Sequence, residues 1–69
     1  MPMTFSEHLL QLRTARDLSQ KALAAEIGIS WRTYQNYELG LREPSLSTLI
    51  ALADFYDLSL DELVCRERH

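Results

Sequence analysis

Two short helical segments, separated by a turn that contains a glycine, occupy residues 19–39. Ser19 can cap a first helix over 19–26, and Gly28 supplies the backbone freedom that the end of a helix often needs. Ser30 can cap a second helix over 30–39, which Gly40 closes. Because the turn between the segments has only three or four residues, we expect the two helices to lie directly against each other.

The small residues in this segment support a close pairing of the two helices. Ala24 lies on the side of the first helix that faces the second, where only a methyl group lets the two axes approach, and Gly28 allows a positive φ at the turn. The apolar residues that would wedge between the pair and the rest of the core are Leu23, Ile27, Ile29, Tyr34 and Tyr37. This arrangement predicts a helix-turn-helix, whose second helix can enter the major groove of DNA.

Helix signals continue on both sides of this pair. Thr4 and Glu7 form a capping box for a helix over about 5–17, in which Phe5, Leu9 and Leu12 share one face. Ser45 follows Pro44 and can cap a helix over 45–56. The residues expected to face inward from that helix are Leu46, Leu49, Leu52, Ala53 and Tyr56.

A last short helix is expected over about 60–65. Ser59 and Glu62 form its capping box, and Leu60 and Leu63 would pack against the core. No segment has the alternating pattern of a strand. The sequence therefore predicts an all-α chain of five helices, and 69 residues are enough for a single domain with one modest core.

Composition narrows the possible classes of protein. Cys65 is the only cysteine, so neither an internal disulfide nor a zinc site built from several cysteines can form, and its role stays open. His8, His69 and Cys65 lack metal-ligand spacing, and no cluster of acid, base and nucleophile is present. The longest apolar run, 49–53, is too short to span a membrane. We expect a cytoplasmic, non-enzymatic protein without a metal or other cofactor.

The distribution of charge is uneven along the chain. The formal net charge is -3, which on its own argues against a nucleic-acid partner. Residues 1–42, however, contain five basic residues against four acidic ones, whereas residues 43–69 contain two basic residues against six acidic ones. One face of the molecule can therefore meet phosphate while the acidic second half stays solvated or meets a protein.

The segment from Gln20 to Gly40 resembles the Cro and repressor type of helix-turn-helix proteins, often called the Xre family. The family has a small residue at the fifth motif position and glycine at the ninth, where this chain has Ala24 and Gly28. The segments Pro44-Ser45-Leu46 and 59–63 are similar to the starts of the family's fourth and fifth helices. The resemblance implies a compact five-helix lambda-repressor-like DNA-binding domain.

The outer face of the second motif helix carries the side chains that relatives use to touch base edges. The candidates for base contacts are Trp31, Arg32, Gln35 and Asn36. A guanidinium can bond to guanine O6 and N7 together, and a side-chain amide can pair in the same bidentate way with adenine. Trp31 could contact a thymine methyl group, stack along a sugar-phosphate edge, or only cover the base of the turn. The alternative for the whole face is a solvated helix surface.

Other polar residues of the motif are candidates for contacts to phosphate. The amide-rich start of the first motif helix favours an anion. The phosphate-contact candidates are Ser19, Gln20, Lys21, Ser30, Thr33 and Arg42. The resemblance also implies a structural pair between Arg13 and Glu38, which bridges the first helix of the fold to the end of the second motif helix.

Two functional hypotheses follow. The first is sequence-specific binding of double-stranded DNA by a transcriptional regulator, a repressor. It would act as a homodimer on a palindromic operator, because one reading helix touches few base pairs and two of them about 34 Å apart are the usual solution. Leu41, Ile50 and Phe55 lie outside the predicted inward faces, so they and the C-terminal helix are candidates for a self-interface or another protein interface. The second hypothesis is an antitoxin or protein-interaction module that works through the acidic half.

Overall fold

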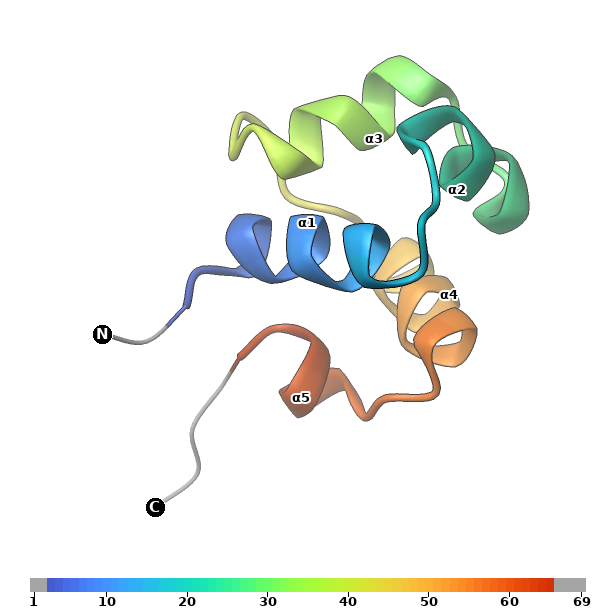
Figure 1. The fold of residues 1–69 in the computed structure, drawn as a ribbon. Helices are drawn as coiled ribbons and strands as arrows, with labels where there is room; N and C mark the ends of the chain where they lie inside the picture. The colour runs from blue at the N-terminus through green and yellow to red at the C-terminus, as the bar shows by residue number, and fades with distance from the viewer. Residues whose placement is uncertain (1–2, 66–69) are drawn as a thin grey trace.

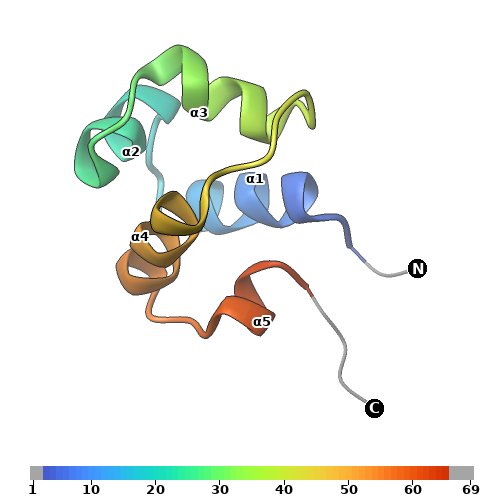
Figure 2. The ribbon, with the colours of Figure 1, turned by 180° about the vertical axis from the view of Figure 1, so that it is seen from behind.

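Five α-helices arranged around one core make up the computed structural model, which describes residues 3–65 (Figure 1). Between those residues there is no strand, and the all-α prediction is confirmed. The helices are α1 (Phe5–Ala15), α2 (Gln20–Ile27), α3 (Trp31–Glu38), α4 (Leu46–Tyr56) and α5 (Leu60–Leu63). Both views show α2 and α3 on one side of α1, with α5 on the other side (Figures 1 and 2).

Each helix begins directly after a hydroxyl residue. The N-cap residues are Thr4, Ser19, Ser30, Ser45 and Ser59, and each side chain accepts a hydrogen bond from the backbone N–H three residues later. The capping boxes predicted at Thr4–Glu7 and Ser59–Glu62 are both present. The helices expected to start at 19, 30 and 45 therefore begin one residue later, because the serine stands outside the helix as its cap.

The ends of the helices differ from prediction by one or two residues. The helix expected over 5–17 ends at Ala15, because Asp17 adopts a left-handed φ of 55° and the Leu18 N–H reaches back to the Arg13 carbonyl at 3.2 Å. The helix expected over 60–65 ends at Leu63 for a similar reason, since Cys65 has a φ of 61°.

The two motif helices also end at slightly different places. α2 continues to Ile27, one residue past the expected end at 26, and its C-cap Gly28 is left-handed with a φ of 77°. The helix expected to reach 39 ends at Glu38, because Leu39 is the C-cap and Gly40 then has a φ of 74°.

The core draws on all five helices. Its buried members are Leu9, Leu23, Ala24, Tyr34, Tyr37, Leu52, Ala53, Tyr56 and Leu63. Two residues expected to face inward do not. Leu46 is 64% exposed and Leu60 is 39% exposed, because each is the first residue of its helix and lies beyond the part that its neighbours cover. Phe55, expected outside, is partly buried against the core and meets Tyr56 edge to face.

Contacts between helices far apart in sequence hold the core closed. The Ser6 hydroxyl of α1 donates to the Tyr37 carbonyl of α3 at 2.9 Å. His8 Nδ1 lies 2.9 Å from the Leu63 carbonyl oxygen, which joins α1 to α5. Arg16 donates to the Phe55 carbonyl oxygen at 3.2 Å and lies over the rings of Phe55 and Tyr56. Within residues 3–65, no helix has the length and apolar character needed to cross a membrane.

Candidate nucleic-acid interface

The angle between α2 and α3 is set by the turn at residues 28–30. Gly28 is left-handed, and the Ile29 N–H then donates to the Ala24 carbonyl at 3.0 Å, which closes the end of α2. Ala24 is 1% exposed, and α2 packs directly against α3. Ser30 then caps α3 through the N–H of Thr33. The turn therefore directs the chain from a closely packed helix straight into the next one.

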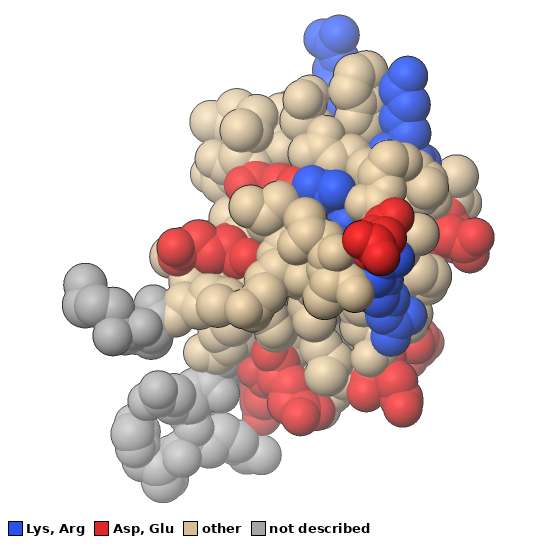
Figure 3. Space-filling view, viewed as in Figure 1, with Lys and Arg blue, Asp and Glu red and all other residues tan. Residues whose placement is uncertain are grey.

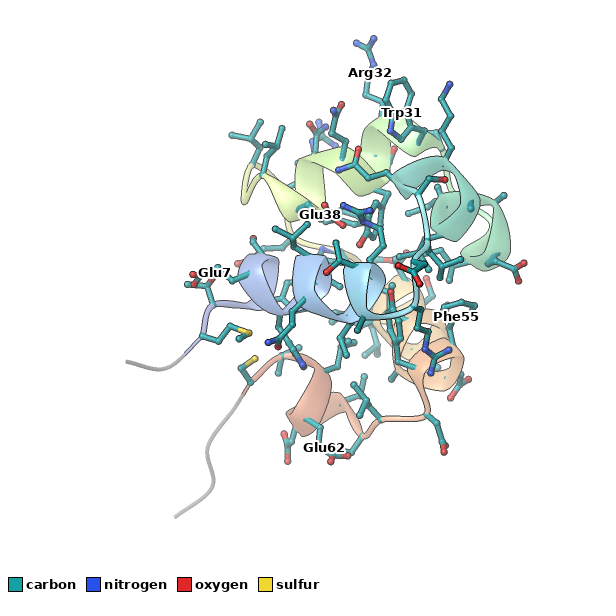
Figure 4. All side chains as sticks on the ribbon, in the orientation of Figure 1. Glu7, Trp31, Arg32, Glu38, Phe55 and Glu62 are labelled. Atoms are coloured by element: carbon teal, nitrogen blue, oxygen red, sulfur yellow. The ribbon has the colours of Figure 1, made fainter. Side chains whose placement is uncertain are left out.

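The two sides of α3 have different roles. Tyr34 and Tyr37 are buried and meet edge to face, with ring centroids 6.5 Å apart. Burial is the main reason that the pKa of Tyr34 lies well above its usual range, so its phenol stays neutral inside the core. The base-contact candidates lie on the other side, where Trp31 and Arg32 are exposed while Gln35 and Asn36 are partly exposed. Figure 4 shows Trp31 and Arg32 pointing away from the body of the molecule.

Charge follows the same division of the molecule. In the space-filling view, Lys and Arg side chains project from the end that carries α2 and α3, whereas Asp and Glu atoms gather at the end that carries α5 (Figure 3). Lys21, Arg32 and Arg42 are exposed. The surface around α3 can therefore meet a polyanion although the chain as a whole is acidic.

Gln20, at the start of α2, links the outer face of α3 to the interior. Its Oε1 accepts a hydrogen bond from Trp31 Nε1 at 3.1 Å, and its Nε2 donates to Glu38 Oε1 at 3.0 Å. The Lys21 ammonium lies 4.8 Å from the centroid of the Trp31 ring, within the range of a cation–π contact. The side chain of Trp31 is thus held against the start of α2.

Glu38 ends α3 in an ion pair with α1. Arg13 donates to its carboxylate twice, from Nε at 2.6 Å and from Nη2 at 3.1 Å, and donates from Nη1 to the Leu18 carbonyl at 2.8 Å. The side chains of Arg13 and Glu38 are only 13% and 6% exposed. Burial raises the pKa of Glu38, but hydrogen bonds from Arg13 and Gln20 oppose that effect, and the pKa lies below its usual value. The pair therefore joins the C-terminal end of α3 to α1.

The remaining phosphate-contact candidates divide into two groups. The hydroxyls of Ser19 and Ser30 accept cap hydrogen bonds from the N–H groups of Ala22 and Thr33, and Ser30 also donates to the Thr33 hydroxyl at 2.7 Å. Lys21 and Arg42 place their charges on the surface, Lys21 in α2 and Arg42 in the segment between α3 and α4. Among residues 3–65, no group of three or more His, Cys, Asp or Glu side chains is placed to hold a metal ion.

Sequence reasoning missed the connections around Gln20. The pattern identified Gln20, Lys21, Trp31 and Glu38 separately. It did not show that Gln20 bonds to both Trp31 and Glu38, at the two ends of α3. Gln20 and Glu38 are 18 residues apart, and Gln20 and Trp31 are 11 apart. Helical periodicity relates residues only within one helix, so these contacts depend on the angle between α2 and α3. A glutamine at the helix start with a glutamate at the end of the next helix was the only available signal.

Comparisons with known proteins identify the same helix-turn-helix fold. Residues 9–63 match the family model described as "Helix-turn-helix". The cryptic phage CTXphi transcriptional repressor RstR of Vibrio cholerae is 43% identical over 60 residues, which are 87% of this chain and 54% of that protein. The chain spans about half the length of the first curated relatives it matches.

Solved structures with the same fold include a transcriptional regulator from Listeria innocua. It superposes with a TM-score of 0.90 at 30% identity, covering 100% of this chain and 64% of that one. The DNA-binding domain of the P22 c2 repressor superposes with a TM-score of 0.84 over 96% of this chain and 87% of that one, at 24% identity, which supports the lambda-repressor-like fold alone. The chain therefore belongs to the helix-turn-helix family of the Cro and repressor type.

Proposed function

We propose that this chain binds double-stranded DNA in a sequence-specific manner as part of a transcriptional repressor, with α3 in the major groove. The observation that carries the proposal is the outer face of α3, where Trp31 and Arg32 project from the body beside the start of α2. Base edges in the major groove are read by side chains at the start of such a helix. Named regulators and repressors among the relatives support the same role.

Each candidate side chain has a distinct part in the proposal. Arg32 would bond to guanine O6 and N7, and Gln35 or Asn36 would pair with adenine N6 and N7. Lys21 and Arg42 would contact phosphates on either side of α3, together with the hydroxyls of Ser30 and Thr33. Ser19 caps α2, and the N-terminus of that helix would face a phosphate of the DNA backbone. Gln20 would contribute a second amide hydrogen, beyond the one that it donates to Glu38.

Selection of bound sequences from a random DNA pool tests the proposal. The selected site should bind the parent protein tightly, and Arg32→Ala should weaken that binding by about 1–3 kcal/mol. Arg16→Gln is the control for charge, because it removes one positive charge at the end of α1 and keeps a side-chain amide that can donate to the Phe55 carbonyl oxygen. Equal binding by the parent and the Arg32 variant would remove Arg32 from the reading face. Failure of the parent to bind any DNA at low salt would favour the protein-interaction alternative.

We also propose that two copies act together on a palindromic site. Exposed apolar side chains at Leu41, Leu46 and Ile50 lie on the segment after α3 and on α4. The same part of the chain contributes Glu43, Pro44 and Leu49 to a groove that Phe5 and Val64 also line. In analytical ultracentrifugation, Leu41→Glu should have a lower apparent molar mass than the parent, because the charge would disrupt the dimer. Leu10→Glu, on the exposed side of α1, should have the same apparent molar mass as the parent. A parent that is monomeric both free and on the selected site would contradict the dimer.

We further propose that the protein acts in the cytoplasm by binding DNA, without catalysing a reaction. The relatives are named as transcriptional regulators, and none of the ones described here is named as an enzyme. Purified protein should therefore leave its target DNA chemically intact during prolonged incubation, as checked by denaturing electrophoresis.

A further inference from the structure

The indole of Trp31 has one polar group, and the protein already uses it. Tryptophan carries a single hydrogen-bond donor, Nε1, and no acceptor. In Trp31 that donor is bonded to Gln20 Oε1 at 3.1 Å. Gln20 is itself held by Glu38, which belongs to the partly buried ion pair with Arg13. What Trp31 presents beyond this bond is therefore apolar ring surface in a fixed position.

One face of the Trp31 ring is also occupied. The Lys21 ammonium lies 4.8 Å from the ring centroid, and a cation placed there is attracted by the electron-rich face. Trp31 is nevertheless 45% exposed, as the first residue of α3 directly after the N-cap. Lys21 places a positive charge beside the indole, so Lys21 and not Trp31 is suited to contact phosphate. The part of the ring that Lys21 does not cover is available to an apolar partner.

We infer that Trp31 reads the C5 methyl group of a thymine in each half-site. This inference rests on the proposed insertion of α3 into the major groove. In that groove the thymine methyl is the largest apolar group that a base pair displays; apart from small C–H groups such as cytosine C5–H, the other groups there are hydrogen-bond donors or acceptors. A side chain without a free donor or acceptor can gain affinity from the methyl group and cannot satisfy the others. The network from Arg13 to Gln20 holds the ring in place for this contact, so Gln20 acts as a positioning residue.

Deoxyuridine scanning of the selected site tests this inference, because uracil differs from thymine only by the missing methyl group. Each thymine of the half-site is replaced in turn, and the dissociation constant is measured for the parent and for Trp31→Ala. We expect one position at which the replacement weakens the parent roughly fourfold, the effect of burying one methyl-sized group. Trp31→Ala should lose that sensitivity at the same position.

Two further variants make the result specific. Arg32→Ala changes the neighbouring exposed side chain, and it should bind more weakly overall while keeping the parent's ratio between thymine and uracil. Trp31→Gln replaces the ring with an amide on a side chain that helices accept, so it answers the question even if Trp31→Ala does not fold.

The outcomes separate this inference from the proposed function. If the parent binds a selected site tightly but Trp31→Ala does not change the effect of any thymine methyl group, the thymine contact is overturned and the DNA-binding role stays intact. The same holds for a selected half-site that contains no thymine, and for a complex in which Trp31 only stacks along the sugar-phosphate edge. Absence of any selected site for the parent overturns both.

Discussion

Glu38 makes the most concentrated set of contacts of any side chain in the motif. Its carboxylate accepts two hydrogen bonds from Arg13 and one from Gln20, and it is 6% exposed. Breaking this partly buried pair leaves the charge of Arg13 with less compensation, but Arg13 would keep the Leu18 carbonyl oxygen as a partner. Glu38→Gln should therefore lower the free energy of unfolding at pH 7 by about 2–3 kcal/mol, near the lower end for such pairs. Urea denaturation measures this loss, with Glu26→Gln on exposed α2 surface as control.

The same carboxylate makes stability depend on acid. Because the pKa of Glu38 is lowered in the folded protein, its contribution is complete above its ordinary pKa of 4.5 and is lost as the pH falls through the lower folded value. The difference in unfolding free energy between the parent and Glu38→Gln should narrow from pH 7 to pH 3. An unchanged difference across that range would show that ionised Glu38 is not what stabilises the pair.

Gln20 allows a test of the network that needs no DNA. Trp31 is the only tryptophan of the chain, so its fluorescence reports on one site. Gln20→Leu removes the acceptor of the indole N–H and leaves only the Lys21 contact, which contributes about 0.5–1 kcal/mol at an exposed site. Fluorescence anisotropy should fall relative to the parent. Gln11→Leu, on exposed α1 surface, should keep the parent value; equal anisotropy in all three proteins would mean that Gln20 does not restrain the ring.

At the scale of the helix pair, the turn depends on one backbone conformation. Gly28 has a φ of 77°, and a Cβ added there would meet no atom within 4 Å, so a side chain would be strained but not crowded. Gly28→Ala should cost about 1–2 kcal/mol, the penalty of a left-handed residue with a Cβ. Gly28→Asn should cost less, because asparagine tolerates this conformation. Midpoints of urea unfolding compare the two variants, and equal losses would point to a cause other than backbone strain.

Helix starts could be predicted from the sequence, whereas helix ends and some burial could not. A serine or threonine that bonds to a nearby N–H is a local signal, so all five N-caps were identifiable. Asp17 and Cys65 end helices in left-handed conformations that non-glycine residues rarely adopt, and nothing in the pattern marked them. Periodicity assigned Leu46 and Leu60 to the inward face, but both are exposed as the first residues of their helices, and a pattern within one helix does not show where its neighbours end.

For the candidate site, the sequence identified the members but not their partners. Arg13 and Glu38 could be paired through the family resemblance, and the structure places them in contact. The bonds from Gln20 to Trp31 and Glu38 depend on how α2 and α3 cross, which no pattern within one helix contains. Whether these side chains meet bases or phosphates is a property of the complex, and it stays a prediction.

At the scale of the whole molecule, an acidic protein is proposed to bind an acidic polymer. The structure makes this reasonable, because Lys21, Arg32 and Arg42 are exposed on or near the helix pair, while five of the acidic residues lie at or beyond residue 54. At physiological ionic strength, charges more than about 8 Å apart across solvent are largely screened. Binding should therefore depend on the few charges that reach phosphate and only weakly on the net charge.

Salt titrations distinguish local contacts from net charge. Each phosphate contact releases counterions, so Lys21→Ala and Arg42→Ala should each reduce the slope of log affinity against log salt by about 1. Asp54→Asn makes the net charge less negative by one unit on exposed α4 surface, and near physiological salt it should leave both the slope and the affinity at the parent's values. A slope that follows net charge in all three variants would mean that DNA is attracted by the whole molecule and not held by the surface around α3.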